Sequence, residues 1–233
     1  MSDKGLTSID YEPAGHPSLF DRWEKGGNAI LQAPLAVRDP DYRKTMLKVF
    51  ENLPAPGRRI IGIGSGNGLV EAELAAAGWD VLATDPCHSA LRLCGDKGLA
   101  TVQLVLGEKL DGDRFDVSYT DGVMGHLWEP EGGTSRAWRH LARLGAPGSL
   151  HVTSNDLSDN DRRPRFAVNA SPEAEFYRPP LGAFEREATQ DGLWTCLSSF
   201  TYTYLRREIE PRRREILVLK LLLDEGVEAE DLS

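Results

Sequence analysis

The sequence predicts an α/β fold, in which a mostly parallel sheet is covered by helices on both faces and ends in an antiparallel β-hairpin. Short apolar runs alternate with amphipathic stretches after the Pro54–Gly57 break, as they do in βα units. A glycine-rich turn at residues 62–68 follows the first apolar run. Two β-rich runs near the end of the chain are separated by a short turn, which favours an antiparallel hairpin over another crossover.

The apolar runs predict parallel strands at residues 59–63, 81–84, 101–106, 115–120 and 150–154. Helices are expected between them because the intervening residues have helical periodicity, for example an apolar stripe formed by Val70, Leu74 and Ala77. The closing runs, residues 195–207 and 215–222, are expected to pair across Glu210 and Pro211.

The length of 233 residues favours one structural domain. Within it we distinguish residues 1–53, an arm and two helices that cover the site, from a core at residues 54–233. The two helices are separated by the Gly26–Gly27 break. A polar insertion at residues 157–180 is too long for an ordinary connection. It is either a lid that recognises the substrate, which we prefer, or a disordered spacer.

The net charge of −9 and the isoelectric point of about 5.1 oppose binding to nucleic acids and to acidic membrane surfaces. The densest basic runs, at residues 206–207 and 212–214, are expected to be solvated beside the hairpin turn. Three cysteines fit neither a disulfide framework nor a zinc site, and no apolar run reaches membrane-spanning length. We therefore expect a cytoplasmic monomer or homodimer with no nucleic-acid or membrane partner.

The strongest local signal is the glycine-rich turn, which contains Gly62, Gly64, Ser65, Gly66 and Gly68. Glycine lets the backbone turn sharply and approach a ligand without a Cβ atom in the way. The helix that follows offers unpaired N–H groups at its start. Such a turn alone is weak support for a nucleotide site, because oxidoreductases that bind dinucleotides, methyltransferases and plain tight turns all contain it.

Asp85 strengthens the nucleotide interpretation. It ends the next apolar run, at the distance along the chain expected for an acid that binds ribose hydroxyls. A role as a helix N-cap is the alternative. We favour the ribose role because the glycines and the acid occur together.

The sequence from about residue 58 to residue 222 resembles the class I S-adenosylmethionine-dependent methyltransferases. The first motif of that family, Asp/Glu-x-Gly-x-Gly-x-Gly after a strand, is similar to residues 60–68, with Gly62 at the acidic position. Gly107 and Glu108 look like the family's Gly-Asp pair, residues 115–127 resemble its fourth motif, and residues 142–150 resemble the segment before its fifth strand. The resemblance implies a Rossmann-like three-layer sandwich with a seven-stranded sheet, and S-adenosyl-L-methionine as the cofactor.

On this basis the predicted cofactor-binding residues come from the glycine-rich turn and from the ends of the neighbouring strands. They are Gly62, Gly64, Ser65, Gly66, Gly68, Asp85, Pro86, Glu108, Lys109 and Thr120.

The methyl acceptor is expected beyond the fourth and fifth strands, because open parallel sheets bind ligands at the carboxyl ends of their strands. Asp121, His126 and Tyr119 are the candidate catalytic residues there. His126 has an ordinary pKa near neutrality and suits a base, although a structural histidine is equally consistent, as is a turn-forming role for Asp121. The predicted substrate-binding residues are Phe20, Trp23, Asn155 and Asp156.

We expect no metal ion at this site. Asp121, Asn155 and Asp156 only loosely resemble the oxygen ligands of the family's magnesium-dependent catechol methylators, and the Asn-Asp order is reversed. A hard cation needs several correctly aimed oxygens.

The resemblance implies methyl transfer to a small molecule, and the acidic residues near the expected acceptor favour an amine. The preference for arginine over lysine is consistent with a GC-rich bacterial genome and so with specialised, antibiotic-like metabolism. Three alternatives remain: an O-methyltransferase, with or without magnesium; an NAD-dependent oxidoreductase, which would have a parallel sixth strand in place of the hairpin; and a non-catalytic module that binds the cofactor.

Overall fold

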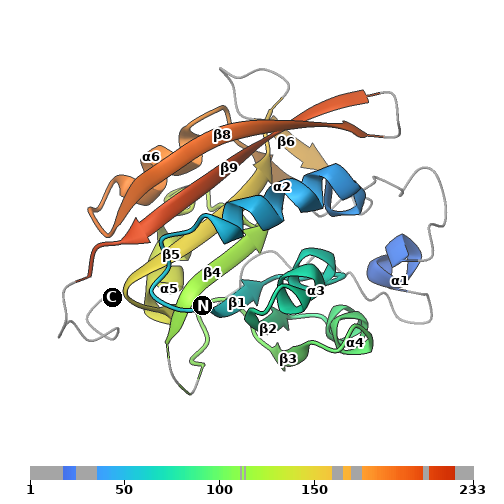
Figure 1. Cartoon of the computed structure of the whole chain (residues 1–233). Coiled ribbons are helices and arrows are strands. Elements are labelled where there is room, and N and C mark those ends of the chain that lie inside the picture. The colour runs from blue at the N-terminus through green and yellow to red at the C-terminus, as the bar shows by residue number, and fades with distance from the viewer. Residues whose placement is uncertain are drawn as a thin grey trace, which may run out of the picture.

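The computed structural model describes residues 18–24, 36–110, 112, 114–158, 165–168, 175–206 and 210–223. One seven-stranded sheet, in the order β3-β2-β1-β4-β5-β9-β8, forms its centre (Figure 1). The first five strands along the chain are parallel, and β8 and β9 form an antiparallel hairpin at one edge, as the sequence predicted. The strands are β1 (Arg59–Ile63), β2 (Asp80–Asp85), β3 (Ala100–Gln103), β4 (Phe115–Asp121), β5 (Gly145–Asp156), β8 (Trp194–Arg206) and β9 (Glu210–Leu221).

Helices cover both faces of this sheet, so the fold has three layers (Figure 1). One face packs against α2, α3 and α4, and the other against α5 and α6. The helical elements are α1 (Leu19–Glu24), η1 (Ala36–Arg38), α2 (Pro40–Glu51), α3 (Leu69–Ala76), α4 (His88–Asp96), η2 (Met124–His126), α5 (Ser135–Leu144) and α6 (Ala183–Thr189).

The central strands are apolar on both sides because both faces of the sheet are covered. Successive residues of β1 show this: Ile60 belongs to the apolar cluster under α2 and α3, and Ile61 to the cluster under α5. The Asp39 side chain caps the start of helix α2. Near the end of this helix, Phe50 packs edge-on against Tyr119 of β4. Helix α2 is therefore held over the fourth strand.

Several strand boundaries differ from the sequence prediction. β5 begins at Gly145 rather than at residue 150. β3 ends at Gln103 rather than at residue 106, because β2, its one neighbour among the described strands, ends at Asp85, which pairs with Gln103. Glu210 and Pro211 do not form the hairpin turn. They lie in β9, with Pro211 opposite Leu205 of β8, and the connection between the strands falls outside the described residues.

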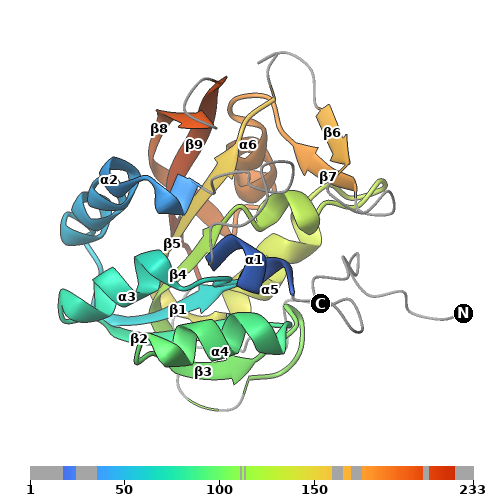
Figure 2. The same cartoon turned by 90° about the vertical axis from the view of Figure 1, so that its right-hand side faces the viewer.

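The insertion at residues 157–180 contains a second, two-stranded sheet, β6 (Arg165–Val168) with β7 (Glu175–Arg178), outside the main sheet (Figure 2). Tyr177 of β7 stacks on Trp128, with ring centroids 5.0 Å apart. The described part of the insertion is thus packed onto the segment that follows η2. None of the helices in the described ranges is long and apolar enough to cross a membrane.

Candidate active site at the carboxyl edge of the sheet

The glycine-rich turn connects β1 to α3 at the carboxyl edge of the sheet. Gly64, Gly66 and Gly68 have φ angles of 65°, 54° and 64°, in the left-handed region that favours glycine. At Gly64 the space is also closed, because a Cβ atom there would stand 2.6 Å from Cγ2 of Val123. Backbone conformation and packing both require glycine, as the sequence pattern indicated.

The carboxylate of Asp85 fastens this turn to the end of β2. It is buried and accepts hydrogen bonds from the backbone N–H of Gly66 at 3.0 Å and of Cys87 at 2.9 Å. The residue at the N-cap position of α4 is Cys87, so Asp85 is not the cap of that helix. Asp85 is held with its carboxylate beside the glycines, and its ribose contact stays a prediction.

Helix α1 lies against the same turn. Its Phe20 is buried against Ala90 and Leu93 of α4, and its ring stands 3.3 Å from the position that a Cβ atom on Gly66 would occupy. Phe20 therefore lies on the cofactor side of the predicted site rather than beyond β4 and β5. The other predicted aromatic of this helix, Trp23, has its backbone in α1, but its side chain lies outside the described residues.

Acidic residues of α1 attach this helix to its surroundings. Asp21 pairs with Arg92 of α4. Glu24 binds Nζ of Lys97 at 2.9 Å and accepts a hydrogen bond from the Asn67 side chain in the glycine-rich turn at 2.5 Å. These contacts hold α1 over the turn.

The remaining predicted cofactor residues are placed differently from one another. Pro86, Glu108 and Lys109 are exposed on the loops after β2 and β3, and the Glu108 side chain turns back to accept a hydrogen bond from the Val105 N–H at 3.1 Å. Thr120 is fully buried, and its hydroxyl donates to Oγ1 of Thr153 at 2.7 Å. The hydroxyl of Thr120 is therefore engaged inside the sheet.

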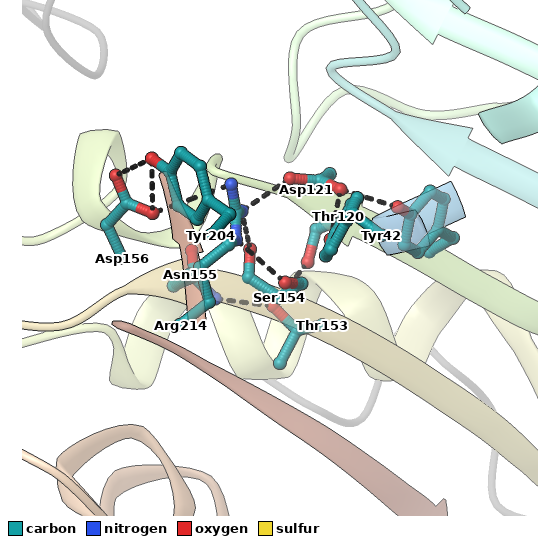
Figure 3. Close-up of polar contacts among 10 residues, drawn as sticks. Tyr42, Thr120, Asp121, Thr153, Ser154, Asn155, Asp156, Tyr204 and Arg214 are labelled. Atoms are coloured by element: carbon teal, nitrogen blue, oxygen red, sulfur yellow. Dashed lines mark hydrogen bonds and ion pairs between the residues drawn. The ribbon is translucent and has the colours of Figure 1, made fainter. Parts of the chain in front are cut away.

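Asp121, at the end of β4, accepts three hydrogen bonds (Figure 3). The hydroxyls of Tyr42 and Tyr119 donate to Oδ2 at 2.6 and 2.7 Å, and the guanidinium of Arg214 donates to Oδ1 at 2.5 Å. Burial first, and then the Asp121 charge, raise the pKa of both tyrosines well above its usual value. Tyr119, a candidate catalytic residue, is thus a protonated donor to Asp121 in this arrangement.

The guanidinium of Arg214 lies between Asp121 and Asp156 (Figure 3). It also donates to the side chain and carbonyl of Ser154 at 3.0 and 2.8 Å. Tyr204 completes the group by donating to Asp156 at 3.1 Å. A side-chain cation therefore sits between the two carboxylates that most resembled magnesium ligands.

This arginine corrects the prediction that residues 212–214 form a solvated basic run. Arg212 and Arg214 are only 7% and 5% exposed, while Arg213 is exposed. The run belongs to β9, where alternate side chains face opposite sides of the sheet. The signal was present in the sequence, because Arg214 is in step with Ile216 and Val218, which are buried on the same face.

His126 and Asn155 also lie at this edge. Burial lowers the pKa of His126 to about 4, so the imidazole is neutral at physiological pH. Asn155 is 4% exposed and donates to Thr153 at 2.7 Å, but its Oδ1 atom is buried without a partner among the described residues. Sequence reasoning missed a third polar group nearby, His151, which is fully buried within 2.8 Å of the Ser118 hydroxyl.

No model of a known protein family matches this chain. A curated protein of Pseudomonas amygdali pv. tabaci, described as a tabtoxin biosynthesis enzyme, is 31% identical over 155 residues. The matched segment is 65% of this chain and 61% of the relative, so the chain spans about three fifths of that protein's length.

Solved structures match more of the chain. A SAM-dependent methyltransferase from Methanosarcina mazei has a TM-score of 0.63 at 16% identity, with 76% of this chain and 98% of that one covered. The 1,6-didemethyltoxoflavin-N1-methyltransferase of Burkholderia thailandensis, with its namesake compound and S-adenosylhomocysteine bound, has a TM-score of 0.61 at 18% identity, covering 86% and 84%.

The cyclase SpnF also matches, with a TM-score of 0.60 at 11% identity and coverage of 78% and 82%. Proteins with this fold are thus named for more than one reaction. At sequence identities this low, structural similarity establishes the fold and not the reaction. The sheet order, the terminal antiparallel hairpin and these neighbours together show that this chain has the fold of the class I S-adenosylmethionine-dependent methyltransferases.

Proposed function

We propose that this chain binds S-adenosylmethionine at the glycine-rich turn and transfers its methyl group to a small molecule. The observation that carries the proposal is the turn itself. It contains three glycines in the left-handed conformation, and the backbone N–H of one of them, Gly66, donates to the buried carboxylate of Asp85. This arrangement lies at the carboxyl edge of a parallel sheet, where such folds bind nucleotides. Asp85 would bind the ribose, and the turn would approach the methionine part of the cofactor.

A nitrogen acceptor in specialised metabolism is the finer form of the proposal. Its support is the name of the Burkholderia enzyme, an N1-methyltransferase, and the name of the tabtoxin relative. Methyl transfer from a sulfonium is an in-line displacement, so the protein needs chiefly to align the acceptor with the methyl group. A base is required only where the acceptor must lose a proton.

We place the acceptor beyond β4 and β5, between η2 and the hairpin of β6 and β7. His126 lies in η2, and Tyr177 of β7 stacks on Trp128 just after it. The insertion at residues 157–180 would close over the acceptor here, while residues 1–53 would cover the cofactor side through α1 and Phe20. Neutral His126 would orient an acceptor or accept its proton.

Two alternatives lose support from specific observations. An NAD-dependent oxidoreductase was expected to have a parallel strand where β8 and β9 form an antiparallel hairpin. A magnesium-assisted O-methyltransferase would use Asp121 and Asp156, between which the Arg214 guanidinium lies. SpnF has a similar fold and is named a cyclase, so a reaction other than methyl transfer is a further outcome that the test must distinguish.

Calorimetric titration with S-adenosylhomocysteine and with NAD tests the cofactor directly. We expect S-adenosylhomocysteine to bind and to raise the melting temperature, since a ligand selective for the native state stabilises it. Binding of NAD in its place would overturn the proposal. Incubation with S-adenosylmethionine and a panel of heterocyclic and aliphatic amines, with and without EDTA, then tests transfer. Methylation that EDTA abolishes and magnesium restores would instead support the magnesium-assisted alternative.

A further inference from the structure

Glu71 is an acid buried inside the fold. It lies in the first turn of α3, directly after the glycine-rich turn, and is 4% exposed. Burial raises its pKa to about 7, although a hydrogen bond from its own backbone N–H opposes this rise. An acid held in this way is costly in its ionised form unless a cation joins it.

The Glu71 side chain occupies the space beside Gly62, the glycine of β1. A Cβ atom on Gly62 would stand 2.9 Å from Oε1 of Glu71 and 2.6 Å from Oγ of Ser65. Gly62 has a φ outside the left-handed region, so its backbone does not require glycine. The Glu71 carboxyl and the Ser65 hydroxyl therefore occupy the space that a side chain at position 62 would need.

The charges around Glu71 are negative. Asp121 and Asp85, from the ends of β4 and β2, both raise its pKa. The Arg214 guanidinium is bonded to Asp121 and Asp156. Within the described part of the chain, no lysine or arginine forms an ion pair with Glu71. Among the described residues, the charged groups named here thus include more acids than cations.

We propose that Glu71 binds the α-ammonium group of the methionine moiety of S-adenosylmethionine, with Gly62 supplying the space for its carboxylate. This inference rests on the proposed function. The cofactor carries an ammonium and a sulfonium, and a cationic ligand is what a buried acid with no ion-pair partner among the described residues would select at the switch between β1 and β4. Binding would make this acid one half of a charge-assisted hydrogen bond.

Two nucleosides separate this role from a structural one. S-adenosylhomocysteine carries the ammonium but no sulfonium, and 5′-methylthioadenosine lacks the whole amino-acid part. In Glu71→Gln we expect S-adenosylhomocysteine to bind at least about tenfold more weakly, while the affinity for 5′-methylthioadenosine changes less than about twofold. Glu73→Gln is the matched control, because Glu73 is in the same helix but pairs with Arg43 of α2. It should leave both affinities unchanged.

A second pair of variants tests the geometry. Gly62→Ala should push the Glu71 carboxyl aside and weaken S-adenosylhomocysteine binding, and its effect should be smaller in a Glu71→Ala background, where only the close contact with Ser65 remains. If Glu71→Gln lowers the affinity for both nucleosides equally, or for neither, the ammonium role is wrong while the proposed function stands. If the wild-type protein binds neither nucleoside, the proposed function itself fails, and this inference fails with it.

Discussion

At the carboxyl ends of β1 and β2, Asp85 is bonded to backbone N–H groups and Glu71 has no ion-pair partner among the described residues. At the ends of β4 and β5, by contrast, Arg214 lies between Asp121 and Asp156. The first region leaves negative charge for a ligand to neutralise, whereas the second neutralises its own. Acidic residues at the edge of a sheet therefore do not by themselves mark a binding site for a cation. What matters is whether the fold already supplies one.

The largest effect is expected from removing the internal cation. Arg214→Leu leaves two largely buried carboxylates without their partner, and the free energy of unfolding should fall by about 3 to 5 kcal/mol. Guanidinium chloride denaturation measures this. Arg213→Ala, which changes the adjacent, exposed residue of β9, should cost less than about 1 kcal/mol. Equal costs for the two variants would mean that the network contributes nothing beyond ordinary strand packing.

A smaller effect, which depends on pH, is expected at Glu71. Its native pKa of about 7 lies above the ordinary glutamate value of 4.5, so the native state holds this proton more tightly than the unfolded state does. The free energy of unfolding should therefore fall, by up to about 3 kcal/mol, as the pH rises from about 4.5 through 7. Glu71→Gln removes this loss and should be more stable relative to wild type at pH 8 than at pH 5. A stability difference that does not vary with pH would contradict the raised pKa.

Asp85→Ala should weaken S-adenosylhomocysteine binding by about 1 to 3 kcal/mol, because the glycine-rich turn loses its carboxylate anchor and the ribose its acceptor. Binding of 5′-methylthioadenosine should weaken with it, since both nucleosides contain the ribose. This pattern sharpens the contrast with Glu71→Gln, which is expected to affect only the ligand with the ammonium group. Unchanged affinity for both would leave Asp85 a structural role alone.

The smallest effect concerns His126. Burial lowers its pKa to about 4, so its proton is lost well below neutrality and its ring nitrogens should show no titration between pH 5.5 and 8 by NMR. The native pKa lies below the unfolded value, so any stability due to this group is lost as the pH falls from about 6.5 towards 4. A measured pKa near 6.5 would instead make His126 a base poised for proton transfer.

Local pattern by itself determined much of the cofactor half of the molecule. Apolar runs with alternating glycines predicted β1, the turn and α3, because a buried parallel strand and a left-handed turn each demand particular residue types at particular positions. The antiparallel hairpin was also predicted from local pattern, because two β-rich runs follow each other with no helix between them. Its turn was misplaced because the sequence does not show where strand pairing stops.

Only the tertiary structure decided which charges are neutralised. Tyr42 in α2 meets Asp121 in β4 across 79 positions, and Arg214 in β9 meets the same carboxylate across 93. No local periodicity encodes such contacts, because they depend on how a helix and three strands come together at one edge. The pairing of Gly62 with Glu71 is of the same kind: the sequence shows a missing side chain at one position and an acid at another, and only the packing of α3 against β1 places the second in the space left by the first.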